Sequence, residues 1–337
     1  MPHCGPARPG GPASIPTPSP ADARRGIRRR SVGSRRWRWI QAAVGLAIVG
    51  YALRFLIQNW VTIRTTPLEW RIRVVPIVAS LGLVLATYGL LIESWRRVVN
   101  GWGAEIAWWS AARVWVLSSM GKYLPGKLWT IAGLGVLGRE QGVPALTATA
   151  SAIVLQLVSI ATGALTVAVT GTAALEREHP AVRLVLWSLI GVAAVTLGLV
   201  LRPALLNWLL RRLGVDATIA TPDPKAMAIG VVANGLAWTM YGVALYWLAA
   251  GLFVDSRLTL VQAIGAFTAS YLAGFLFLLA PGGFGVRETV FFLVTESALG
   301  PAQALALAAV SRVGMTLADL LAAAPFVLAR RRVHDGT

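Results

Sequence analysis

The sequence predicts an all-α, polytopic membrane protein. Three observations support this fold class: 56% of the 337 residues are hydrophobic, only 13% are charged, and the mean hydropathy is +0.65. Soluble globular domains carry about 25% charged residues, so this composition is typical of a chain embedded in a bilayer. We expect about six transmembrane helices and two re-entrant helical hairpins that form an inverted repeat.

Six apolar stretches are long enough to cross a bilayer, which takes about 20 residues. They cover approximately residues 39–57, 74–92, 145–172, 182–201, 226–253 and 302–329. Two further apolar regions, 106–138 and 260–298, are each interrupted by helix-breaking residues. The breakers are Pro125 and Gly126 in the first region, and Pro281, Gly282 and Gly283 in the second. By hydropathy alone, each region could be two full spans or one re-entrant hairpin.

The basic residues favour the hairpins, because Lys and Arg near span ends stay on the cytoplasmic side. With two hairpins, 18 basic residues lie on the side of the N-terminal tail and six on the other side. Four full spans would instead place the basic loop around Arg211 outside and the loop around Arg177 inside. We therefore expect a multi-pass protein of the cell membrane with both termini in the cytoplasm.

The two interrupted regions also resemble each other in sequence. The breaker proline precedes a helix-opening proline by 19 residues in the first (Pro144) and by 20 residues in the second (Pro301). Under the hairpin topology they enter the membrane from opposite sides. Inverted repeats with helices broken at corresponding positions indicate a transport site near the midplane.

The ends of the chain differ in composition from the apolar body. Residues 1–38 hold nine Arg, a single acid (Asp22) and seven of the 18 prolines. Such a segment cannot bury enough apolar surface to offset its ordering entropy. We expect a disordered basic tail over 1–38, a transmembrane domain over 39–330 and a short tail over 331–337. We read the net charge of +17 as a topology signal, and we expect no nucleic-acid partner.

Eight ionisable residues lie in or beside the apolar stretches: Lys122, Lys127, Arg139, Glu140, Arg287, Glu288, Arg312 and Asp319. A charge that faces lipid costs several kcal/mol, so these groups should face one another or a wet cavity. Arg312 and Asp319 lie on one helix face and could pair with Arg287 and Glu288. Internal ion pairs that only hold the helices together are the alternative to a functional site.

A helix that stops inside the membrane leaves backbone groups that protein, water or ligand must satisfy. Its N-terminus attracts anions, and neighbouring cations would add full charge. We therefore expect an anionic head group, such as phosphate, to bind at the hairpin tips. The residues predicted to bind it are Lys122, Lys127, Arg139 and Arg287. Those predicted to balance charge or to gate are Glu140, Glu288, Arg312 and Asp319.

Other sites known from soluble enzymes lack their parts here. Residues 121–128 follow a P-loop pattern, but Leu128 replaces the Ser or Thr that would hold magnesium. The three His residues lie in tails or loops, and the lone Cys4 lies in the basic tail. Neither metal-assisted hydrolysis nor a Ser-His or Cys-His mechanism has its residues. We expect no enzymatic activity, metal or cofactor.

Four segments carry a resemblance to a known family: residues 120–129 (MGKYLPGKLW), 138–143 (GREQGV), 279–288 (LAPGGFGVRE) and 311–312 (SR). They resemble the lysylphosphatidylglycerol synthase transmembrane region, or flippase-like, family. The resemblance covers about residues 40–330. It implies re-entrant hairpins and movement of anionic or lipid-linked molecules between leaflets.

The resemblance has two limits. Larger members of the family add a soluble aminoacyl-transfer domain, and because this chain ends at Thr337 we expect that activity to be absent. Many members carry Glu-Arg and a nearby Asp after the first hairpin, where this chain has Gln156 among apolar residues. We expect Gln156 to take a polar, charge-balancing or gating role.

These observations predict a flippase-like transporter that moves an anionic or lipid-linked head group between leaflets. Its expected partners are membrane lipids, anionic or linked to polyprenyl phosphate. The alternative is a non-transporting membrane accessory protein for a cell-envelope glycosyltransferase or lipid-modifying enzyme.

Overall fold

The computed structural model describes residues 70–123, 128–172, 180–202, 223–277 and 285–334, together with residues 204, 208, 212 and 283. The chain divides into two units, Met1–Leu46 and Ala47–Thr337, and all described residues belong to the second. The predicted basic tail and the first predicted span, 39–57, lie outside the described residues. So do Lys127 and the breaker residues Pro125, Gly126, Pro281 and Gly282.

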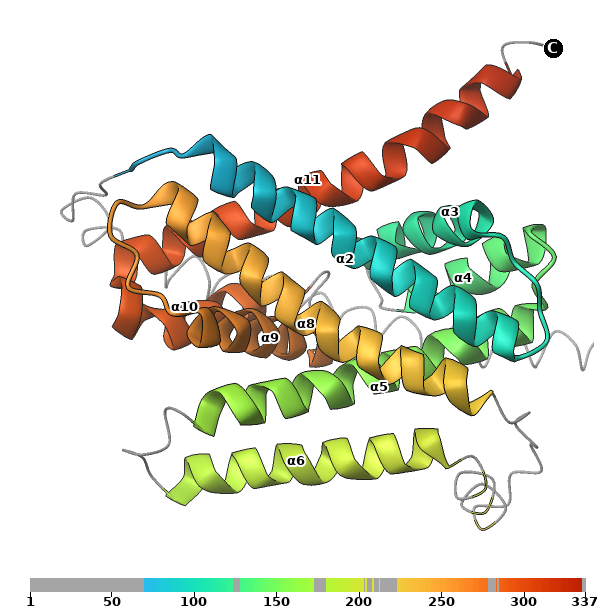
Figure 1. The fold of residues 1–337 in the computed structure, drawn as a ribbon, viewed down its shortest axis with the longest axis horizontal. Helices are drawn as coiled ribbons and strands as arrows, with labels where there is room; N and C mark the ends of the chain where they lie inside the picture. The colour runs from blue at the N-terminus through green and yellow to red at the C-terminus, as the bar shows by residue number, and fades with distance from the viewer. Residues whose placement is uncertain are drawn as a thin grey trace, which may run out of the picture. The chain divides into compact units, whose positions relative to one another are not determined.

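The described residues are almost entirely helical, as Figure 1 shows, and within them the one β-type pairing is an isolated bridge between Trp70 and Phe253. The helices are α2 (Val74–Gly101), α3 (Trp108–Ser119), η1 (Met120–Tyr123), α4 (Leu128–Glu140), α5 (Ala145–Thr172), α6 (Pro180–Leu201), α8 (Pro224–Leu252), α9 (Leu260–Leu276), α10 (Val286–Leu299) and α11 (Pro301–His334). The predicted all-α class is confirmed.

Four described helices are long and apolar enough to cross a bilayer: Val74–Gly101, Ala145–Gly171, Pro224–Leu252 and Pro301–Leu328. They match four of the predicted spans, and a shorter apolar stretch, Trp187–Leu201, matches the predicted span 182–201. A polytopic membrane protein is therefore confirmed.

Helix α2 continues past the predicted end of its apolar stretch. The prediction placed Arg96 and Arg97 in a loop, but the helix runs on to Gly101. Both arginines pair with Glu93, one turn earlier, at 2.8 Å for Arg96 and 2.7 Å for Arg97. Ion pairs at these spacings stabilise the more exposed face of the helix, while Trp95, Val98 and Val99 are buried in the core.

The first interrupted region forms two short helices, α3 and α4, with η1 before the break. They run antiparallel, since a Cβ built on Gly133 would lie 3.2 Å from Ser118 and one on Gly121 would lie 2.8 Å from the backbone of Thr130. With 12 and 13 residues, each is about 18–20 Å long, which is shorter than the hydrocarbon core of about 30 Å. The predicted breakers fall between the end of η1 at Tyr123 and the start of α4 at Leu128.

The second interrupted region forms α9 and α10, of 17 and 14 residues. Gly283 lies at their junction with φ +73°, and a Cβ there would lie 2.9 Å from the Cα of Gly274 on α9. Helix α10 begins after Gly285 (φ 84°), whose N–H donates to Glu288 Oε2 at 2.7 Å. Both regions are thus pairs of short helices, while the side from which each enters the membrane stays a prediction.

Small residues allow the long helices to pack closely. Helices α2 and α8 lie side by side (Figure 1), and a Cβ on Gly251 of α8 would lie 2.8 Å from Ile77 of α2. The hydroxyl of Ser80 donates to the carbonyl of Ala244 across this contact at 2.6 Å. Helix α9 approaches α8 at Gly242, where a Cβ would lie 2.4 Å from the Cα of Ile264. This packing places α2, α8, α9 and α11 around a common core.

Candidate functional site

The carboxylate of Asp319 is buried in the core of the helix bundle, with only 2% of the residue exposed. It accepts hydrogen bonds from the hydroxyls of Tyr88 on α2 at 2.7 Å and of Tyr123 on η1 at 2.6 Å. The ammonium group of Lys122, also on η1, lies 2.6 Å from the same carboxylate. A buried charge persists only when it is paired and hydrogen-bonded. Asp319 therefore ties α11 to α2 and to the first pair of short helices.

A second ion pair ties α11 to the second pair of short helices. The guanidinium of Arg312 on α11 donates to Oε1 of Glu288 on α10. The other oxygen of Glu288 accepts the N–H of Gly285 at the start of α10. Arg312 and Asp319 are seven residues apart, so they share one helix face at a separation of about 10 Å along the axis. One face of α11 thus contacts residues from both short-helix pairs.

Arg287, next to Glu288, lies over two aromatic rings. Its guanidinium carbon is 5.2 Å from the ring centroid of Phe267 and 5.3 Å from that of Tyr271, both on α9. The two rings are stacked with centroids 6.0 Å apart. These distances are in the range of cation–π contacts. Within the described parts of the chain Arg287 forms no salt bridge, so its N–H donors can serve an anionic ligand.

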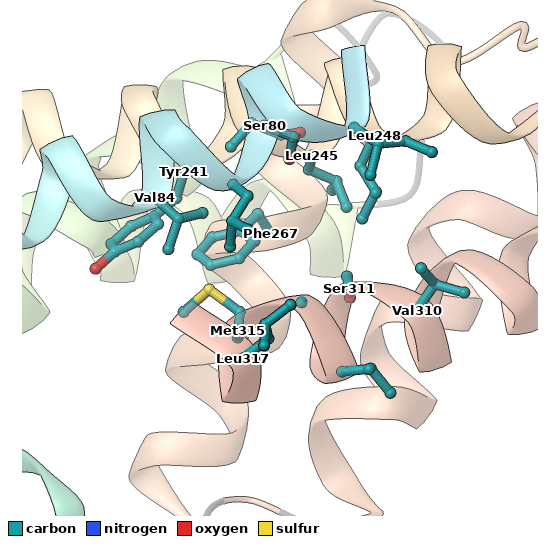
Figure 2. Close-up of a pocket in the computed structure, with 15 residues that line it drawn as sticks. Ser80, Val84, Tyr241, Leu245, Leu248, Phe267, Val310, Ser311, Met315 and Leu317 are labelled. Carbon is teal, nitrogen blue, oxygen red and sulfur yellow. Dashed lines mark hydrogen bonds between the residues drawn. The ribbon is translucent and has the colours of Figure 1, made fainter. Parts of the chain in front are cut away.

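An apolar cavity of about 210 Å³ lies beside these charges, between α2, α8, α9 and α11 (Figure 2). Tyr241 and Phe267 line it and are stacked with centroids 5.0 Å apart. The two serines in its wall already donate to backbone carbonyls, Ser80 to Ala244 and Ser311 to Ala308. The cavity wall therefore offers hydrocarbon contacts and little hydrogen-bonding capacity.

The structure brings together five of the predicted site residues: Lys122, Arg287, Glu288, Arg312 and Asp319. The expected contact of Arg312 with Glu288 is present. Asp319, however, pairs with Lys122 of the first short-helix pair and not with Arg287. The spacing along α11 could place both residues on one face, but could not tell which neighbouring helix each would meet.

The remaining predicted residues lie elsewhere. Arg139 and Glu140 are exposed at the end of α4 that is distant from η1. Gln156 is half-buried in the middle of α5. A role in head-group binding or gating stays a prediction for these three and for Lys127, which lies outside the described residues.

The aromatic partners of the charged residues were not predicted from the sequence. Tyr88 and Tyr123 donate to Asp319, while Phe267 and Tyr271 lie beneath Arg287. A signal was present in part, because a Tyr inside an apolar span needs a partner for its hydroxyl. Tyr88 lies in the predicted span 74–92 and meets this criterion.

Metal binding has no support in the described part of the chain. It contains no group of three or more His, Cys, Asp or Glu side chains placed to hold an ion. The charged residues that do meet there form pairs of opposite sign.

Comparison with known proteins agrees with the fold and with the resemblance in sequence. The family described as "Lysylphosphatidylglycerol synthase TM region" matches residues 38–323, which is most of the chain. No curated protein and no solved structure matches it significantly. The family match spans both short-helix pairs and the face of α11 that contacts them. The chain is therefore a multi-pass membrane protein that belongs to the lysylphosphatidylglycerol synthase transmembrane-region family.

Proposed function

We propose that this protein is a flippase-like transporter that binds the anionic head group of a membrane lipid and moves it between leaflets. The observation that carries the proposal is Arg287, which lies on the Phe267 and Tyr271 rings without a salt bridge to any described carboxylate. A cation among membrane helices is costly unless it meets an anion or water. A guanidinium binds phosphate through two parallel N–H donors, so a phosphate-bearing lipid suits this site.

The two ion pairs on α11 supply charges that can change partners during transport. Lys122 contacts Asp319 and Glu288 contacts Arg312, so each short-helix pair contributes one member. An anionic head group bound at Arg287 would compete with Glu288 for Arg312 and with Asp319 for Lys122. Rocking of one repeat against the other would then expose the head group to alternate sides of the membrane.

We test this function by reconstituting the full chain into phosphatidylcholine liposomes that contain fluorescent phosphatidylglycerol. Chemical quenching of the outer leaflet reports the rate at which lipid crosses. The wild type is expected to move the probe at least ten times faster than an Arg287→Ala, Glu288→Ala variant. Arg97→Ala is the matched control, because this arginine is half exposed and, among the described residues, its salt bridge is to Glu93 on the helix surface, where such pairs contribute little.

The same assay separates transport from other functions. Wild-type rates equal to those of the double variant would contradict transport. Retained lipid binding without movement would instead favour the membrane accessory role for an envelope enzyme. The proposed transport involves no covalent step, so the probe should be recovered chemically unchanged. Conversion of the probe to a new lipid would indicate an enzyme.

The proposed location is the cell membrane, with both termini in the cytoplasm. Reporter fusions at Glu176 and Asp255 should report the outer side, and a fusion at Asp216 the cytoplasm. These sides follow from the distribution of basic residues. Reversal at any one of the three would contradict the inverted arrangement of the short-helix pairs.

A further inference from the structure

We infer that the apolar cavity between α2, α8, α9 and α11 is a hydrocarbon-chain site, which holds part of one acyl chain of the phospholipid whose head group binds at Arg287. The inference rests on the proposed head-group function and adds to it a place for the chain. It predicts that lipid recognition uses two parts of the protein, a charged part and an apolar part. The lining, the position and the length of the cavity each support it.

The lining favours hydrocarbon over water. It consists mainly of aliphatic and aromatic side chains: Val84, Leu245, Leu248, Phe267, Met315 and Leu317. A buried water needs two to four polar partners, and the hydroxyls of Ser80 and Ser311 already donate to backbone carbonyls. A chain that fills the cavity is thus more favourable there than water.

The position of the cavity joins it to the charged residues. Val84, Tyr241 and Met315 line one end of the cavity (Figure 2). Leu248 and Val310 line the opposite end. One helical turn beyond Val84 on α2 is Tyr88, and one turn beyond Met315 on α11 is Asp319. These two residues are joined by a hydrogen bond of 2.7 Å.

The ring of Phe267 provides a second connection. It lines the cavity and also lies 5.2 Å below the guanidinium carbon of Arg287. A molecule with an anionic group at Arg287 and an attached chain can therefore contact both surfaces of this region. A free anion without a chain would leave the cavity unused.

The size and opening of the cavity fit a segment of an acyl chain. On α2 the lining runs from Ile77 to Val84, and on α11 from Val310 to Leu317. Seven residues of helix span about 10 Å, which is less than the length of a membrane acyl chain. Val313 lines the cavity and is 67% exposed, so the cavity opens at the surface of membrane-spanning helices. The rest of the chain can remain in the bilayer.

Gly314 provides a way to fill the cavity without disturbing the fold. It lines the cavity, and a Cβ built on it meets no atom within 4 Å. Gly82 on α2 also has open space around its Cβ, but it does not line the cavity. Both glycines lie inside helices, so both substitutions raise helix propensity equally. Gly314→Leu and Gly82→Leu are therefore a matched pair, and Gly314→Phe is a second filling variant.

The test uses the full chain in phosphatidylcholine nanodiscs that contain phosphatidylglycerol with a photoreactive diazirine in the middle of one chain. Mass spectrometry maps the adducts after illumination. The wild type and Gly82→Leu are expected to carry adducts on cavity residues such as Leu245 and Met315. Gly314→Leu should reduce these adducts at least five-fold, and so should a probe that has a choline head group.

Two results would overturn the inference. The first is equal labelling of lipid-facing residues and cavity residues in the wild type. The second is cavity labelling that is unchanged in both Gly314 variants at wild-type thermal stability. Failure of the transport proposal gives a different pattern, in which the cavity is labelled but the probe does not cross the membrane. Transport without cavity labelling would retain the proposed function and reject the chain site.

Discussion

Replacing Asp319 by Ala is expected to destabilise the protein by about 3–5 kcal/mol. The carboxylate is buried and accepts hydrogen bonds from the hydroxyls of Tyr88 and Tyr123, at 2.7 and 2.6 Å. Hydrogen bonds to a charged group contribute about 1.5–3 kcal/mol each. The side chain of Lys122 is 33% exposed, so its ion pair adds at most about 1 kcal/mol. After the substitution, Tyr88, Tyr123 and Lys122 can partly find other partners, which reduces the loss of stability. The expected loss then lies in the range measured when one partner of a buried pair is removed.

The assay is thermal unfolding of the full chain in detergent, followed by size-exclusion chromatography. At about 2 °C per kcal/mol, Asp319→Ala should lower the apparent Tm by roughly 6–10 °C. Asp319→Asn should lower it less, because the amide oxygen still accepts one tyrosine hydroxyl while the attraction to Lys122 is lost. Tyr88→Phe removes a single bond and should also have an intermediate effect.

Equal Tm values for the wild type and Asp319→Ala would contradict a stabilising role for this carboxylate. They would show that the carboxylate contributes no net stability beyond its desolvation cost. An Asn variant as unstable as the Ala variant would refute the division between hydrogen bonds and charge. In that case the attraction to Lys122 would account for most of the effect.

Two further predictions concern α10 and the contact between α8 and α9. Glu288→Gln keeps an oxygen for the helix cap but loses the charge that pairs with Arg312, so it should lower the Tm less than Glu288→Ala. A double-mutant cycle with Arg312→Ala should give a coupling of about 0.5–3 kcal/mol, and strict additivity would contradict the pair. Gly242→Ala should lower the Tm sharply, because its Cβ would lie 2.4 Å from the Cα of Ile264. Gly235→Ala meets no atom within 4 Å and should be neutral or slightly stabilising in the same assay.

The membrane-spanning helices could be predicted from sequence because hydropathy reports directly on burial in lipid. The ends of the helices were harder to predict. Helix α2 continues nine residues past its predicted apolar stretch, to Gly101. Glu93 pairs with Arg96 and Arg97 on its more exposed face, while Trp95, Val98 and Val99 are buried in the core. The average hydropathy falls at the charged residues Glu93, Arg96 and Arg97, so this segment was predicted to be a loop.

The interrupted regions could also be located, because Pro and Gly side by side within an apolar stretch end a helix there. Their packing could not be predicted. The close contact of Gly274 with Gly283 depends on two backbones nine residues apart that meet in space. Sequence spacing carries no information on such an approach.

The charged residues of the site could be predicted from the sequence, but the partner of each one could not. Charges within apolar segments marked Lys122, Glu288, Arg312 and Asp319, and the structure joins these four in two ion pairs. The choice of Lys122 for Asp319 depends on how η1 meets α11. The aromatic support of Arg287 likewise depends on the packing of α10 against α9.

The proposed transport depends on the binding of an anionic lipid head group at Arg287. The most direct measurement is the affinity of the nanodisc-reconstituted protein for phosphatidylglycerol relative to phosphatidylcholine, determined by native mass spectrometry. The wild type and Arg97→Ala should prefer phosphatidylglycerol to the same degree, and Arg287→Ala should reduce that preference about ten-fold, which corresponds to about 1.4 kcal/mol. An unchanged preference in Arg287→Ala would show that Arg287 does not bind the head group.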